Sequence, residues 1–155
     1  MRPHVRRFAP VIAAVLTMAG AATIAGTSSA SADGGYCTGN EVADSPYPVT
    51  TSTGAVYGYL HLYWNASTGT NCAVTVKTGA LAGPRTYTSV NLAACAGDTP
   101  DACSTWVEDS PDGGYYTSYA GPVSVKGAGH CVELSGEISN NSGVWASVRK
   151  GPFHC

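Results

Sequence analysis

Six cysteines constrain this chain more than any other feature, because all of them follow an N-terminal segment with the pattern of an export signal. They are Cys37, Cys72, Cys95, Cys103, Cys131 and Cys155. An even number of cysteines in an exported chain is typical of a disulfide framework, so three disulfides are predicted. A metal site is the alternative, but the chain has no Cys-x-x-Cys pair, and its two His-Cys neighbours lack the spacing of zinc ligands.

The export signal is predicted at residues 1–32. Three arginines within the first seven residues are followed by an uncharged run, rich in Ala, Val and Ile, over residues 8–24. Ala30-Ser31-Ala32 then places small residues where signal peptidase requires them, so Asp33 is expected to start the mature chain. A transmembrane anchor is the alternative, but the apolar run is shorter than the roughly 20 strongly apolar residues that span a bilayer. We therefore expect a secreted protein whose mature chain does not span a membrane.

The mature region, residues 33–155, is short and acidic. Its length suits one domain with a modest core, so a single domain is predicted. It holds five basic and ten acidic residues, which gives a formal net charge of −5. An acidic surface without a basic cluster argues against nucleic acid and anionic lipid as partners.

Sequence alone leaves the disulfide connectivity open, because six cysteines allow many pairings. Cys95 and Cys103 bracket the turn-forming segment Ala-Gly-Asp-Thr-Pro-Asp-Ala and are expected to close a local loop. If the others pair by proximity, Cys37 joins Cys72 and Cys131 joins Cys155. The loop-entropy model then assigns about 2.6 kcal/mol to the local bridge and about 3.8 and 3.5 kcal/mol to the other two.

The mature sequence has the composition of strands and turns, being rich in Gly, Ser, Thr, Val and Tyr. Residues 55–64 alternate with period two and place two sets of side chains on opposite faces: Val56, Leu60, Leu62 and Trp64 against Tyr57, Tyr59, His61 and Tyr63. Residues 72–78 alternate too, with Cys72, Val74 and Val76 expected to point inward. The two segments are predicted to form a β-hairpin.

Further short strands are predicted at 85–92, 104–108, 115–119, 123–125, 130–134 and 144–148. Gly or Pro interrupts almost every gap between them. This spacing predicts an all-β fold, a small antiparallel β-sandwich or barrel cross-linked by three disulfides. The pattern does not choose between sandwich and barrel.

Candidate catalytic groups are few. The mature chain has three histidines, and no Gly-x-Ser-x-Gly segment accompanies them: His61, His130 and His154. Two acidic groups would suit a glycosidase: Glu108-Asp109 with Asp112, and Glu133 with Glu137. A calcium site around Asp109 and Asp112 is a further alternative, but this loop lacks the additional oxygen ligands of an EF-hand. Both acidic groups contain turn-forming residues, Asp109-Ser-Pro-Asp-Gly113 and the Gly between the two glutamates, so solvated turn carboxylates are the favoured interpretation. We predict that the protein is not an enzyme and has no metal site and no cofactor.

An aromatic strand face is the best candidate for a binding surface. Tyr57, Tyr59 and Tyr63 share one side of a predicted strand. Other aromatic residues would extend it: Tyr115, Tyr116, Tyr119, Trp106 and Trp145. An exposed face of this kind would stack on sugar rings or polymer chains. The simpler alternative is that the tyrosines fill the buried side of a two-layer β fold.

Several segments in order carry a family resemblance: Thr53-Gly-Ala-Val, Leu62-Tyr-Trp-Asn-Ala-Ser-Thr-Gly-Thr-Asn-Cys-Ala-Val-Thr-Val76, Tyr116-Thr-Ser-Tyr-Ala-Gly-Pro-Val-Ser-Val125, Gly129-His-Cys-Val132 and His154-Cys155. The chain resembles the spore-associated protein A family of filamentous actinobacteria over most of residues 36–155. The resemblance implies a small exported protein of the spore or cell surface, with no established enzymatic activity and no catalytic residues. The family pattern has four cysteines, so the segment around Cys95 and Cys103 is an insertion that adds a disulfide.

The expected function is therefore that of a secreted, non-catalytic cell-surface or spore-associated protein, with a cell-wall or spore-surface polymer as its partner. Two alternatives stay open. The first is a carbohydrate- or wall-binding module that uses Tyr57, Tyr59 and Tyr63. The second is a secreted hydrolase inhibitor, whose Cys95–Cys103 loop would bind the enzyme because its closure limits the entropy lost on binding.

Overall fold

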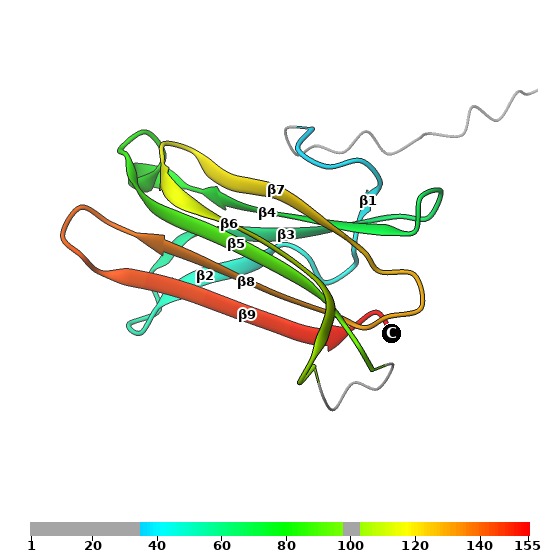
Figure 1. Cartoon of the computed structure of the whole chain (residues 1–155). Coiled ribbons are helices and arrows are strands. Elements are labelled where there is room, and N and C mark those ends of the chain that lie inside the picture. Colours follow the sequence, from blue (N-terminus) through cyan, green and yellow to red (C-terminus); the bar gives the residue numbers. More distant parts are fainter. Residues whose placement is uncertain (1–34, 98–102) are drawn as a thin grey trace, which may run out of the picture. The chain divides into compact units, whose positions relative to one another are not determined.

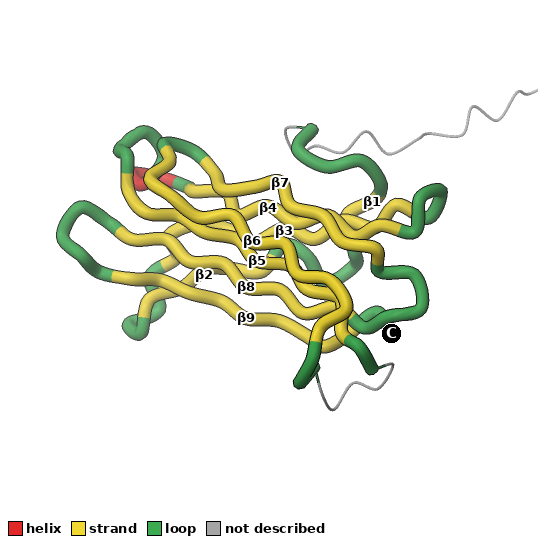
Figure 2. The backbone as a smooth tube through the Cα atoms, in the orientation of Figure 1, coloured by secondary structure: helices red, strands yellow, loops and turns green. Residues whose placement is uncertain are grey.

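The computed structural model describes residues 35–97 and 103–155 (Figures 1 and 2). These residues form nine strands and one 3-10 turn: β1 Asn40–Glu41, β2 Tyr47–Thr51, β3 Val56–Asn65, β4 Thr70–Lys77, η1 Gly79–Leu81, β5 Thr86–Cys95, β6 Trp106–Tyr116, β7 Tyr119–Lys126, β8 Val132–Ser139 and β9 Trp145–Phe153. The all-β prediction is confirmed. The predicted signal peptide and the centre of the Cys95–Cys103 loop lie outside the described residues. Within the described ranges, no helix has the length and apolar character needed to cross a membrane.

The strands form two antiparallel layers that belong to one continuous sheet. The strand order is β6-β5-β8-β9-β2-β3-β4-β7, and the short β1 pairs with β3. One layer holds β6, β5, β8 and β9, and the other holds β2, β3, β4 and β7 (Figure 1). The layers join at one corner through two residue pairs between β2 and β9, Thr50 with Ser147 and Thr51 with Ala146. The result is a flattened, nearly closed barrel, between the two architectures that the sequence predicts.

At the opposite corner, where β6 lies beside β7, side-chain carboxylates replace a backbone ladder. Asp112 Oδ2 accepts a hydrogen bond from the N–H of Gly121 at 2.6 Å. Glu108 Oε2 accepts one from the N–H of Lys126 at 2.7 Å. Both carboxylates belong to β6 and both amides to β7. Because a bare strand edge leaves N–H groups unpaired, these two contacts pair N–H groups at the edge of β7. We call this corner, where Asp112 and Glu108 of β6 bond Gly121 and Lys126 of β7, the seam.

The turn predicted at residues 109–113 is wrong. β6 runs without a break from Trp106 to Tyr116, so it joins most of the predicted strand 104–108 to the start of the predicted strand 115–119, whose other residues form the β6–β7 turn and the first position of β7. β6 stands at the end of the strand order, where a sheet tolerates a proline such as Pro111. Asp112 does not bond an amide of its own turn; it bonds β7.

The turn predicted between Glu133 and Glu137 is also wrong, because both residues lie on the continuous strand β8. Gly136, between them, marks a close approach of the two layers. A Cβ at this glycine would lie 2.5 Å from Thr75 Oγ1 on β4 and 3.5 Å from Leu60 Cδ1 on β3. The glycine is therefore required by packing between layers and not by a change in chain direction.

The main core lies between the layers, and its largest fully buried aliphatic side chains come from both: Val49, Leu60, Leu62, Val90, Leu92, Val125, Val132, Leu134 and Ile138. A second cluster covers the outer face of β3 and β4, where Tyr63, Cys72 and Val74 pack against Tyr36 and Cys37. The inward direction predicted for Cys72, Val74 and Val76 is therefore wrong. Ala73 faces the main core in their place.

All three expected disulfides are present, and no described cysteine is free. Cys37–Cys72 holds the N-terminal segment against β4. Cys95–Cys103 closes the connection between β5 and β6. Cys131–Cys155 holds the C-terminus against the start of β8. Pairing by proximity is thus confirmed.

Lys77, at the end of β4, is a buried cation with only 4% of its surface exposed. Its Nζ donates three hydrogen bonds, to the carbonyl oxygen of Pro84 at 2.7 Å, to Thr86 Oγ1 at 2.8 Å and to the carbonyl oxygen of Tyr116 at 3.0 Å. Three acceptors match the three N–H groups of an ammonium. Burial lowers the pKa of Lys77. The side chain ties β4 to the opposite layer.

The seam offers a test through Tyr116, whose hydroxyl donates to Asp112 Oδ1 at 2.7 Å. This hydrogen bond, together with burial and the charge of Asp112, raises the pKa of Tyr116. We expect Asp112→Asn to lower the pKa of Tyr116 towards its ordinary value. The measurement is the phenolate absorbance difference between wild type and variant across an alkaline titration. Glu108→Gln is the matched control and should leave that titration unchanged; superimposable curves for wild type and Asp112→Asn would contradict the assignment.

Candidate functional site

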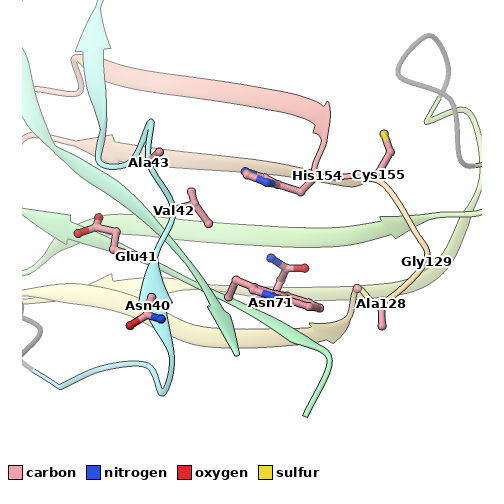
Figure 3. A pocket seen from close by; sticks show the side chains of 11 residues that line it. Asn40, Glu41, Val42, Ala43, Asn71, Ala128, Gly129, His154 and Cys155 are labelled. Carbon is pink, nitrogen blue, oxygen red and sulfur yellow. The ribbon is translucent and has the colours of Figure 1, made fainter. Parts of the chain in front are cut away.

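A cavity of about 530 Å³ lies between β1, the β7–β8 connection and the C-terminus. Figure 3 shows the side chains of His154 and Asn71 on opposite sides of this cavity, while Glu41 points away from both. Asn71 is buried and donates from Nδ2 to the carbonyl oxygen of Tyr63 at 3.4 Å. The polar side chains that line the cavity thus include the imidazole of His154 and the amides of Asn40 and Asn71, and the amide of Asn71 is already bonded to the backbone.

Glu41 belongs to a hydrogen-bonded group that joins β1 to β3. Its Oε1 accepts from Ser45 Oγ at 2.6 Å and lies 2.8 Å from His61 Nδ1. Ser45 Oγ in turn accepts from the N–H of Leu62 at 3.0 Å. In a hydrolase triad, the serine and the acid contact different nitrogens of the histidine. Here Ser45 and His61 both contact the same oxygen of Glu41, which is a hydrogen-bond network that joins strands and not the arrangement of a triad.

Two of the other candidate catalytic residues, His130 and His154, each precede a cysteine of the Cys131–Cys155 disulfide, whose Cα atoms are 3.8 Å apart. His130 is in the β7–β8 connection, and His154 follows β9. Glu133 forms an ion pair with Arg149 of β9. In the part of the chain that the structure describes, no group of three or more His, Cys, Asp or Glu residues could hold a metal ion.

The three tyrosines of the predicted binding face differ in their exposure to solvent. Tyr63 is 1% exposed and packs against Tyr36 and Cys37. Tyr57 is half-buried, and its hydroxyl accepts a hydrogen bond from Asn140 Nδ2 at 2.9 Å. Tyr59 is 39% exposed. The face of β3 therefore does not present three open rings to a ligand.

A different aromatic cluster lies on the outer face of the other layer, and we call it the aromatic row: Tyr115 of β6, Tyr87 of β5 and Trp145 of β9. Tyr87 is the register partner of Tyr115. Trp145 pairs with Ser139 of the intervening strand β8, whose Oγ accepts from the N–H of Tyr87 at 3.2 Å. The Tyr87 ring centroid lies 6.1 Å from that of Tyr115, at an interplanar angle of 84°, and 5.3 Å from that of Trp145, at 54°. Three strands thus contribute to one ring cluster.

A shallow groove of about 340 Å³ follows the aromatic row. Arg85 lies at one end, where its Nη2 donates to the carbonyl oxygen of Tyr115 at 3.0 Å. Asn140 lies at the other end, in the β8–β9 turn. Its Oδ1 accepts from the N–H groups of Ser142 and Val144, both at 2.9 Å. These bonds within the turn hold the segment that carries Trp145.

Next to the aromatic row, the same outer face carries two further sets of register partners, each with one residue from β6, β5, β8 and β9. The first set is Gly113, Ser89, Glu137 and Ser147, and the second is Pro111, Asn91, Ser135 and Arg149. The Tyr87 ring lies over Gly113 of the first set, since a Cβ at Gly113 would be 2.8 Å from Tyr87 Oη. Asn91 Oδ1 is a buried acceptor without a hydrogen-bond partner among the described residues. The face therefore combines rings with polar groups.

Sequence reasoning considered Tyr115 and Trp145 only as additions to the tyrosine face of residues 55–64, and it did not include Tyr87. A local signal for Tyr87 exists, because it alternates with the buried Thr86 and Thr88. Its neighbours in the aromatic row follow from strand register, which no local pattern specifies.

Comparison with known proteins places the chain in a family. No family model matches it, and no solved structure is significantly similar to it. It is 36% identical over 142 residues to Spore-associated protein A of Streptomyces coelicolor, in an alignment that spans 83% of this chain and 80% of that relative. Identity at this level over most of both chains agrees with the ordered motifs of the sequence. The chain belongs to the spore-associated protein A family.

Proposed function

We propose that residues 33–155 form a secreted, non-catalytic protein of the spore or cell surface. The observation that carries the proposal is the extensive similarity to a protein named for its association with spores. Three disulfides support export, because such bonds persist in oxidising compartments outside the cytoplasm. The predicted signal peptide at residues 1–32 directs the chain to the secretion machinery.

The contacts of the acidic side chains support a non-catalytic role. Glu41 is bonded to a serine and a histidine, Asp112 and Glu108 bond backbone amides at the seam, and Glu133 is paired with an arginine. A general acid or base must be within reach of a ligand proton. Each of these carboxylates already has a partner within the protein, which favours a role in joining strands over proton transfer to a ligand.

Fractionation tests this proposal. We expect an epitope-tagged chain, expressed in a sporulating actinobacterium, to be enriched on mycelium or spores, with an N-terminus at Asp33 by mass spectrometry. A fusion of residues 1–32 to an unrelated secreted domain is the control, and it should appear in the medium because it lacks the surface-binding part. Recovery of the tagged chain only from the medium would refute the surface location.

A further inference from the structure

We propose that the aromatic row, with the polar face beside it, is a binding site for a neutral polysaccharide chain. The inference rests on the surface location proposed above and adds the class of ligand and the residues that bind it. It moves the binding surface from the tyrosines of β3 to the opposite layer of the barrel.

The exposure of the rings is the first argument. Tyr115 is 65% exposed and Trp145 is 52% exposed, and both contact the half-buried Tyr87 between them. Exposed rings grouped on one face mark an interaction surface, whereas scattered ones do not. Pyranose rings present apolar C–H faces, which stack on aromatic rings and bury a large area at small entropic cost.

Rigidity of the groove is the second argument. Asn140 accepts two backbone N–H bonds within the β8–β9 turn and donates to the Tyr57 hydroxyl of the other layer. Arg85 is bonded to the backbone of Tyr115 at the opposite end. A site that is already ordered loses less entropy when a ligand binds. In this arrangement Tyr57 supports the turn and does not contact the ligand.

The polar groups beside the rings are the third argument. Ser89, Asn91, Ser135 and Ser147 offer hydroxyl and amide groups in register across β5, β8 and β9. Sugar hydroxyls both donate and accept, so such side chains match the rim of a pyranose. Four strands span about 14 Å at the usual strand spacing, which accommodates a short run of sugar rings rather than a single one.

Charge selects a neutral polymer over an anionic one. Glu137 is exposed next to the aromatic row, and the net charge of the mature chain is −5. Arg149 on the same face is neutralised by Glu133, which leaves Arg85 as the cation at the groove. The negative electrostatic potential of an acidic protein repels wall polymers that are rich in phosphate.

Retention on insoluble polymers tests the inference. Purified secreted chain would be incubated with chitin, cellulose and peptidoglycan that carries anionic wall polymer. We expect wild type to be retained on at least one of the two neutral polymers. Tyr115→Ala/Trp145→Ala should weaken that retention at least tenfold, with an unchanged far-ultraviolet circular dichroism spectrum. Both substitutions are on exposed side chains, so folding is expected to survive.

Tyr59→Ala/Trp106→Ala is the matched control, because it removes one exposed tyrosine and one exposed tryptophan outside the aromatic row. Its retention should equal that of wild type. Equal losses in both double variants, no retention of wild type on chitin or cellulose, or binding only to the anionic polymer would each overturn the inference. A wild-type chain found on spores that fails to bind either neutral polymer overturns only this site. A chain that binds but is found only in the medium overturns only the surface location.

Discussion

Reduction of the three disulfides is expected to unfold the secreted chain, or to lower its thermal midpoint by more than about 20 °C. The loop-entropy contributions sum to roughly 10 kcal/mol, which is comparable to the 5–15 kcal/mol stability of a typical domain. Circular dichroism melts with and without a phosphine reductant measure the effect, and mass spectrometry after alkylation counts the thiols. An unchanged midpoint with six free thiols would refute this account.

The three bridges are expected to contribute unequally. Loss of Cys37–Cys72 in a double alanine variant should cost the most, about 3.8 kcal/mol from loop entropy, and loss of Cys95–Cys103 the least, about 2.6 kcal/mol. The structure strengthens this ranking, because Cys37 belongs to the segment that covers Tyr63 and Val74 on the outer face of β3 and β4. Urea unfolding of the three double variants gives the ranking, and the reverse order would contradict it.

Replacement of Lys77 by methionine is expected to cost about 3 kcal/mol of unfolding free energy. Methionine keeps the apolar stem but supplies no donor, so two backbone carbonyls and the Thr86 hydroxyl each lose a hydrogen bond. A buried polar group left without a partner costs about 1–3 kcal/mol, and water can reach some of the three acceptors. Equilibrium urea denaturation of wild type and variant provides the measurement.

Lys126→Met is the control for that substitution. Lys126 is exposed, and its Nζ has one bond, to the carbonyl oxygen of Thr68 at 3.3 Å. Its removal should change the unfolding free energy by less than about 0.5 kcal/mol. Equal effects of the two substitutions would show that Lys77 does not join the layers.

The lowered pKa of Lys77 adds a pH signature. Between that lowered pKa and the ordinary value of 10.5, the unfolded chain binds more protons at this residue than the folded chain. The free energy of unfolding of wild type should therefore rise with pH in this window, relative to Lys77→Met. A constant difference between the two proteins would contradict the burial of a charged amine.

The sequence was sufficient for features that depend on local pattern. Alternation over residues 55–64 and 72–78 predicted the hairpin of β3 and β4, because period two is a property of any half-buried strand. Cysteine positions predicted three bridges and the local Cys95–Cys103 pair, while the other two pairings followed only on the condition that neighbouring cysteines join, as they do in the structure. The ordered motifs identified the family before any comparison.

Local propensity failed where a distant strand supplies the reason for a residue. Pro111 and its flanking aspartates read as a turn, but they form an edge strand whose Asp112 bonds an amide of β7. Gly136 also read as a turn, but Thr75 of the other layer occupies the place of its side chain. In both cases the residue type is set by a partner that the local sequence does not reveal.

The sequence by itself determined the class of fold, the number of disulfides and the aromatic content of this protein. Only the tertiary structure decided which rings are open. Cys37–Cys72 draws an N-terminal segment over Tyr63, and the register of β5, β6, β8 and β9 brings Tyr87, Tyr115 and Trp145 to one outer face. Alternation assigns side chains to two faces of a strand, but burial of a face depends on what packs against it, and that contact is made by residues far away in the chain.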